Sequence, residues 1–117
     1  MATNSVVSFN KQTDLATGLD AVITVNKALG DRLRAHVVRT LAQDAFSVSE
    51  LCTIFAVTQP AISHHLRILR DAHLVESRKE GTSIFYQRPV HPTASWVQAI
   101  FSALDVHPMA GEYAAGV

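Results

Sequence analysis

The spacing of apolar residues changes in the second half of the chain, and this change restricts the fold more than any other feature. Up to Ala72 the apolar residues recur at helical intervals. After Ala72, two strand-like segments, 74–78 and 83–87, lie on either side of a turn at Glu80-Gly81. The sequence therefore predicts a helix that is followed directly by a β-hairpin.

Helices are also predicted on the N-terminal side of this unit. Residues 14–29 carry a helical stripe of apolar side chains that ends at Gly30, and Asp31 can cap the helix that follows. A third, short helix begins after Ser47 or Ser49, because either hydroxyl can accept a hydrogen bond from a free backbone N–H.

The helix that precedes the hairpin has a clear start signal. Thr58 is a good N-cap, and Pro60 falls in the first turn, where its missing N–H costs nothing. A last helix is expected over 93–106. The order helix, helix, helix, turn, helix, hairpin, helix is typical of a winged helix-turn-helix, a mainly α fold with a small β-hairpin.

The length of 117 residues suits one compact domain. We expect a flexible arm at 1–12, a winged helix-turn-helix domain at 13–107, and a tail at 108–117. Residues 1–10 do not read as a secretion signal, and no apolar stretch approaches ~18 residues. The single cysteine excludes an intramolecular disulfide. We therefore expect a cytoplasmic protein.

The helix before the hairpin carries polar and cationic side chains opposite its apolar line. Gln59, Ser63 and His64 could reach base edges in a major groove, and Arg67 and Arg70 could pair with phosphates. The hairpin tip would lie along the neighbouring backbone or minor groove. The candidate DNA-binding residues are Thr58, Gln59, Ser63, His64, His65, Arg67, Arg70, Arg78, Lys79 and Thr82.

The charge of the chain has to be considered by segment. The formal net charge is zero, whereas nucleic-acid binders are often basic. Between Gln59 and Arg88, however, five cations stand against three anions. An ordinary surface helix with a solvated face is the alternative interpretation, and the cationic hairpin directly after the helix favours DNA binding over it.

The segment from Phe46 to Val75, which contains TQPAISHHLRILRDAHLV, resembles the arsenic-repressor/SmtB (ArsR) family of bacterial regulators. The continuation ESRKEGTSIFY resembles the wing of that family, and ALGDRLR at 28–34 resembles the start of its second helix. The resemblance covers 28–88 and is most specific over 58–75. It implies a homodimer formed by the first and last helices, and operator binding that an inducer relieves.

Two apolar stripes at opposite ends of the chain exceed what one small domain needs to cover itself. We therefore expect a two-fold homodimer that binds two half-sites about one helical turn of DNA apart. The residues expected in the dimer interface are Leu15, Leu19, Val22, Ile23, Trp96, Ile100, Phe101 and Leu104.

Some members of the family that the chain resembles sense metals, but this sequence has too few metal-binding residues at the positions those members use. Ser47 and Ser49 stand where the first two cysteines of one family motif would fall, and only Cys52 matches the third. One thiolate cannot build a soft-metal site, and Cys52 lies on an apolar helix face, which favours packing over sensing. His91 and Asp105 are at most half of a zinc site of the type that other members carry on the last helix.

The resemblance implies a repressor, and the missing ligands then predict that it needs no cofactor or metal and is released by a non-metal signal, either a small molecule or a redox change. His65 matches the histidine of the family's Ser-x-His-Leu run, and phosphate contact and packing are its two candidate roles. No role can be assigned to His36, His73, His91 or His107. A metal- or thiol-responsive repressor and a protein-binding winged helix are the alternatives, and we expect no enzyme because no catalytic constellation is present.

Overall fold

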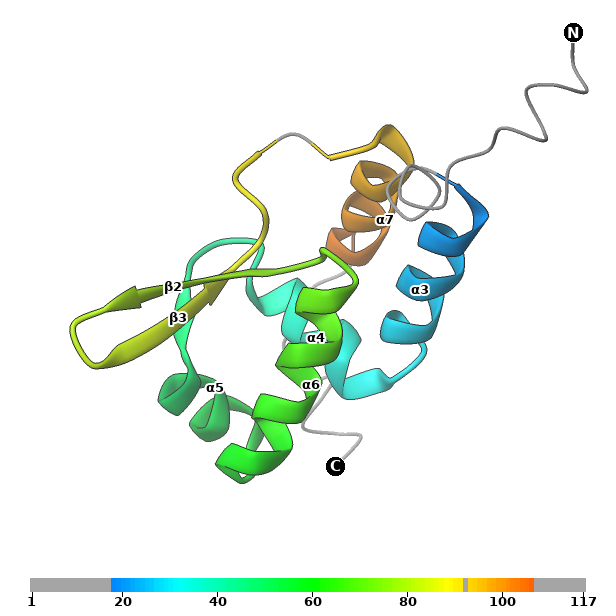
Figure 1. Ribbon diagram of the computed structural model, residues 1–117. Helices are drawn as coiled ribbons and strands as arrows, with labels where there is room; N and C mark the ends of the chain where they lie inside the picture. Colours follow the sequence, from blue (N-terminus) through cyan, green and yellow to red (C-terminus); the bar gives the residue numbers. More distant parts are fainter. Residues whose placement is uncertain (1–17, 92, 107–117) are drawn as a thin grey trace, which may run out of the picture.

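The computed structural model describes residues 18–91 and 93–106, and Figure 1 labels its elements. The fold is mainly α with a small antiparallel sheet, as predicted. The elements are α3 (Leu19–Leu29), α4 (Arg32–Thr40), β1 (Phe46–Ser47), α5 (Val48–Phe55), α6 (Gln59–Asp71), β2 (Glu76–Glu80), β3 (Ser83–Gln87) and α7 (Ser95–Asp105). The expected arm at 1–12, the tail at 108–117, Leu15 and His107 lie outside the described residues.

Side-chain caps begin three of the helices. Asp31 accepts a hydrogen bond from the backbone N–H of Arg34, and Thr58 accepts one from the backbone N–H of Ala61. Of the two serines considered for α5, Ser47 is the cap, and it forms a reciprocal capping box with Glu50. All three starts were predicted, because an N-cap depends on residues within one turn of itself.

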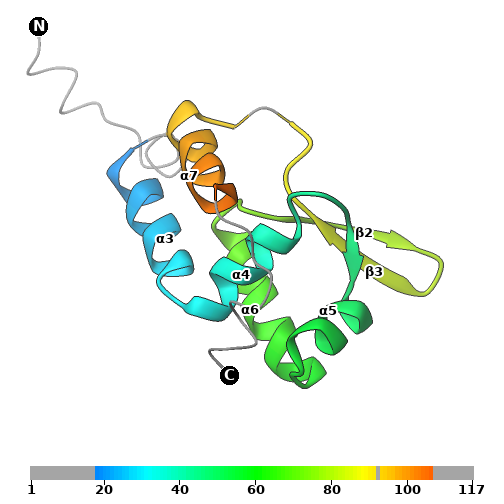
Figure 2. The ribbon, with the colours of Figure 1, turned by 180° about the vertical axis from the view of Figure 1, so that it is seen from behind.

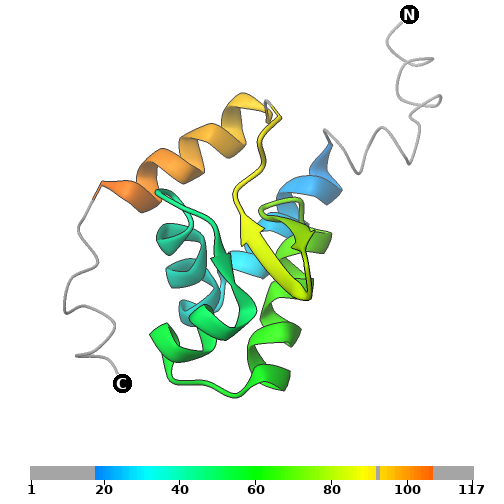
Figure 3. The same cartoon turned by 90° about the vertical axis from the view of Figure 1, so that its left-hand side faces the viewer.

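The helix-turn-helix unit is built on a buried contact between α5 and α6. Ile62, Leu66 and Leu69 of α6 are fully buried, as their spacing predicted, and they belong to the same core as Leu51 and Phe55 of α5. Figure 3 shows the short connection that joins the two helices at the lower edge of the molecule. This packing leaves the opposite side of α6 free.

The sheet contains one strand that was not predicted. β1 pairs with β3, with Phe46 opposite Tyr86. A two-residue strand is too short to show a period, and its partner lies far along the chain. The strand order is β1-β3-β2, so β3 lies in the middle.

The hairpin itself starts later than expected. The predicted strand began at Leu74, but Leu74 and Val75 are buried in the core, and the paired segment β2 begins at Glu76. Gly81 adopts a positive φ of 63° in the turn. Figures 1 and 2 show that the hairpin projects on the side of the molecule opposite α3.

The first and last described helices pack on the central helices. α3 contacts α4 and α6, whereas α7 contacts α4. The buried face of α3 is formed by Val25 and Ala28, and that of α7 by Val97 and Phe101. Within the described part of the chain, no helix combines the length and the apolar character that crossing a bilayer requires.

Candidate nucleic-acid interface

One face of α6 carries four of the ten predicted DNA-binding side chains. Gln59, Ser63, Arg67 and Arg70 are all exposed. They are spaced by four, four and three residues, which places them along one stripe at 3.6 residues per turn. The stripe changes from neutral polar groups at the N-terminal end of the helix to cations near its C-terminal end.

The N-terminal end of this stripe is also the positive end of the helix dipole. The Thr58 hydroxyl accepts a hydrogen bond from the backbone N–H of Ala61, at 3.4 Å. The main role of Thr58 is therefore to cap the start of α6. Free backbone N–H groups in a first helical turn attract anions such as phosphate. The stripe and the helix start together offer hydrogen-bond donors and acceptors as well as positive charge.

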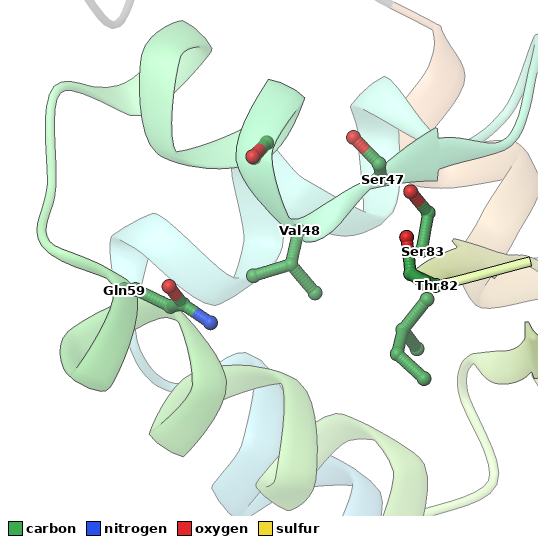
Figure 4. Close-up of a pocket in the computed structure, with 7 residues that line it drawn as sticks. Ser47, Val48, Gln59, Thr82 and Ser83 are labelled. Carbon is green, nitrogen blue, oxygen red and sulfur yellow. The ribbon is translucent and has the colours of Figure 1, made fainter.

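A groove joins the start of α6 to the hairpin (Figure 4). Its volume is about 180 Å³, and it lies between the first turns of α5 and α6 and the turn of the hairpin. Its lining residues are Ser47, Val48, Ser49, Gln59, Thr82, Ser83 and Ile84. Gln59 and Thr82, predicted separately, therefore line one surface.

Sequence reasoning missed the three serines of this groove as binding residues. Ser47 and Ser49 were considered only as helix caps or as replacements for thiols, and Ser83 only as part of a strand. No local signal marks them, because the groove exists only once the hairpin has folded back towards α5 and α6.

The two cations of the hairpin differ in their surroundings. Arg78 forms an ion pair with Glu80 at 2.9 Å, donates a hydrogen bond to Oε1 of Gln87, and lies over the ring of Phe85. Lys79 is exposed, and it forms no ion pair among the described residues. Lys79 therefore offers an uncompensated charge, whereas the charge of Arg78 is partly neutralised inside the hairpin.

His65 occupies a different side of α6 from the stripe. Its ring is half-buried, and its Nδ1 lies 3.0 Å from Nη1 of Arg34 on α4. Its position on the helix turns it towards α4, which favours packing over phosphate contact, while its place among the DNA-binding residues stays a prediction. His64 remains exposed, with its ring centre 5.6 Å from that of His65.

Two other histidines also have defined surroundings. His36 is buried on α4, at 4% exposure. His73 is exposed and adopts a left-handed backbone conformation just after α6. Neither position was assigned a role from the sequence.

The groups considered as metal ligands have other partners in the structure. Cys52 is half-buried and packs against the core. The Ser47 hydroxyl belongs to the capping box, and the Asp105 carboxylate is paired with Arg88 at 2.8 Å. Across residues 18–91 and 93–106, no three His, Cys, Asp or Glu side chains are grouped so that they could hold a metal ion. The expectation of a metal-free protein stays a prediction.

The predicted interface residues are unequally exposed. Leu19 is 70% exposed and Ile23 is 41% exposed, whereas Val22, Trp96, Ile100 and Leu104 are half-buried. Phe101 is only 7% exposed within one chain. Its ring packs in the core of its own protomer and leaves little surface for a partner, while the assignment of Phe101 to the interface stays a prediction.

The sequence of this chain is similar to those of known bacterial regulators. The family described as "Bacterial regulatory protein, arsR family" matches residues 31–77, which run from the cap of α4 into β2. The HTH-type transcriptional regulator KmtR of Mycobacterium tuberculosis is 36% identical over 88 residues, or 74% of this chain and 68% of that protein. The biofilm growth-associated repressor of Xylella fastidiosa is 30% identical over 102 residues, or 87% and 89% of the two chains.

The fold has solved relatives as well. The homodimeric winged helix-turn-helix DNA-binding domain of a possible ArsR-family regulator from Mycobacterium bovis has a TM-score of 0.64 and 31% sequence identity. The similarity covers 75% of this chain and 78% of that one.

Proposed function

Because the chain belongs to the arsR family of bacterial regulatory proteins, and is thus a DNA-binding transcription regulator, we propose that it acts as a homodimeric repressor of an operator. The observation that carries the proposal is the exposed stripe of Gln59, Ser63, Arg67 and Arg70 on α6, which runs beside the groove shared with the hairpin. A regulator of this kind works in the cytoplasm, where bacterial DNA lies.

In this proposal α6 enters the major groove with its N-terminus leading. Gln59 and Ser63 lie nearest to the base edges, since amide and hydroxyl groups both donate and accept hydrogen bonds. Arg67 and Arg70 pair with phosphates, and Lys79 and Thr82 contact the neighbouring backbone or minor groove. Because the groove lies between α6 and the hairpin, the contacts made by α6 and those made by the hairpin fall on neighbouring parts of the same DNA.

The repressor binds as a two-fold dimer, with α3 and α7 at the interface. The exposed Leu19 and Ile23 support this arrangement, since large apolar side chains on a small domain are normally covered. The homodimeric relative from Mycobacterium bovis supports it too. Leu15 remains a proposed interface residue on the same helical spacing.

We propose a non-metal signal, either a small molecule or a redox change, as the cause of release from DNA. Soft metals need two or more thiolates held together, and each protomer offers Cys52 alone. The main alternatives are release by a metal or thiol signal through Cys52 or histidines, and a winged helix that binds protein instead of DNA.

The test is a mobility-shift assay on the promoter region next to the gene, with unrelated DNA as competitor. We expect a specific Kd of about 10⁻⁸ M or tighter. Arg67→Ala should weaken binding to both DNAs, because a phosphate contact carries no sequence information. Lys27→Ala on α3 is the matched control, since it also removes one exposed cation. Wild-type protein that binds neither DNA would favour the protein-binding alternative.

A further inference from the structure

One guanidinium group connects three helices. The Nε atom of Arg34 donates to the backbone oxygen of Ala28 at 2.7 Å, and Nη2 reaches the oxygen of Lys27 at 3.5 Å. Its Nη1 lies 3.0 Å from Nδ1 of His65. Arg34 on α4 therefore joins the last turn of α3 to the middle of α6, and Figure 1 shows these three helices packed together.

The chemistry of this contact determines the protonation state of the histidine. A guanidinium group only donates hydrogen bonds, so Nδ1 of His65 must accept, and the proton of the neutral ring must be on Nε2. A doubly protonated ring has no acceptor to offer. The contact with Arg34 therefore exists only while His65 is neutral.

The surroundings of His65 favour the neutral form. Burial lowers the pKa of His65 from its ordinary value of 6.5, and the charges of Arg34 and His64 lower it further, while Asp31 opposes them. Of the groups that shift the pKa of His65, Asp31 and Arg34 belong to α4 and its cap, and His64 belongs to α6. Helix α3 affects His65 indirectly, because the carbonyl groups of Lys27 and Ala28 hold the Arg34 side chain.

We propose that His65 is a positioning residue, which accepts a hydrogen bond from Arg34 and thereby holds the recognition helix α6 in register with the dimerisation helix α3. This inference rests on the proposed function, because it requires that α6 binds DNA and that α3 binds the partner protomer. Two half-sites at a fixed spacing can be bound together only if α6 keeps its orientation to the dimer axis.

The positioning role and a direct DNA contact predict opposite pH dependence. If His65 only positions α6, its protonation breaks the bond to Arg34, and operator affinity falls as the pH is lowered. If His65 instead contacts phosphate, its protonation adds a positive charge beside the DNA, and affinity rises as the pH is lowered. The sign of the dependence on His65 therefore separates the two roles.

The experiment compares wild type with two variants at the same residue. His65→Leu removes the acceptor, and we expect about a tenfold loss of operator affinity. His65→Asn retains an acceptor oxygen in the position of Nδ1 and cannot be protonated, so we expect affinity within about threefold of wild type at neutral pH. The ratio of wild-type to His65→Asn affinity should fall between about pH 7.5 and about pH 5.5.

Three results would overturn the proposal: full affinity in His65→Leu, no rescue by His65→Asn, or a ratio that rises in acid. Nitrogen-15 NMR of the wild-type imidazole gives a readout that needs neither the variants nor DNA. We expect the tautomer with the proton on Nε2 and a pKa below 6.5; a proton on Nδ1 would refute the contact with Arg34. Wild-type protein that bound no DNA would instead refute the proposed function, and the NMR result would still decide the contact.

Discussion

The guanidinium group of Arg88 binds both carboxylate oxygens of Asp105, at 2.9 and 2.8 Å. Its Nε and Nη2 atoms also donate to the backbone oxygen of Val38, at 2.9 and 2.7 Å, and it lies over the ring of Phe101, 4.6 Å from the ring centre. Arg88 thus joins the end of the hairpin to α4 and α7. The sequence analysis counted Arg88 among the cations between Gln59 and Arg88 that favour DNA binding. In the structure its side chain instead holds α4, α7 and the hairpin together.

Loss of this contact should destabilise the protein. The Arg88 side chain is 15% exposed, so Arg88→Met leaves the Val38 oxygen and the Asp105 carboxylate without their donor. We expect a loss of about 2 kcal/mol in the free energy of unfolding by urea. Arg78→Met is the control, because its side chain is 45% exposed and its ion pair should contribute about 0.5 kcal/mol or less. Equal effects in the two variants would contradict the assigned role of Arg88.

The hairpin cations should differ in their contribution to DNA binding. Lys79→Ala should lower the slope of log Kd against log salt by about one, as expected when one phosphate contact is lost. Arg78→Ala should change the slope less, because Glu80 already neutralises part of its charge. Fluorescence anisotropy across a salt series measures both slopes. A larger change for Arg78 would mean that Arg78 leaves Glu80 to bind the DNA.

Dimer formation should depend on the exposed side of α3. Leu19→Glu places a charge in the proposed interface without touching the core, and we expect a monomer in sedimentation together with loss of operator binding. Thr24→Glu is the control, since Thr24 is an exposed α3 residue outside the proposed interface. A Leu19→Glu variant that stays dimeric would exclude this face.

A charged substitution at Phe101 tests the stability of the protomer, although the sequence analysis placed Phe101 in the dimer interface. Because Phe101 is buried in the protomer, Phe101→Glu should lower the stability of the fold itself. The loss of near-ultraviolet circular dichroism would distinguish this unfolding from simple dissociation.

Metal ions should not act as the signal. In calorimetry with zinc and with arsenite we expect no sub-micromolar binding, because the single thiol of Cys52 packs against the core and Asp105 is paired with Arg88. A Cys52→Ser variant run alongside identifies the ligand if binding occurs. Tight binding that disappears in Cys52→Ser would restore a metal- or thiol-based switch.

Residues close together in the chain determined the parts of this fold that could be predicted. The caps Asp31 and Thr58 and the buried line on α6 were correct, because a cap or a helical stripe involves residues within a few positions of each other. The exposed stripe of α6 follows from the same period. The helices and the hairpin were therefore predictable from the sequence, to within a few residues at their ends.

Tertiary structure alone decided which distant residues meet. The pairing of Phe46 with Tyr86, the contact of Arg34 with His65 and the ion pair of Arg88 with Asp105 each join residues from separate elements. Whether an apolar or charged side chain faces the core, another helix or solvent depends on how those elements pack. Helical periodicity shows that a residue lies on one face of its helix, but only the packed structure determines what that face contacts.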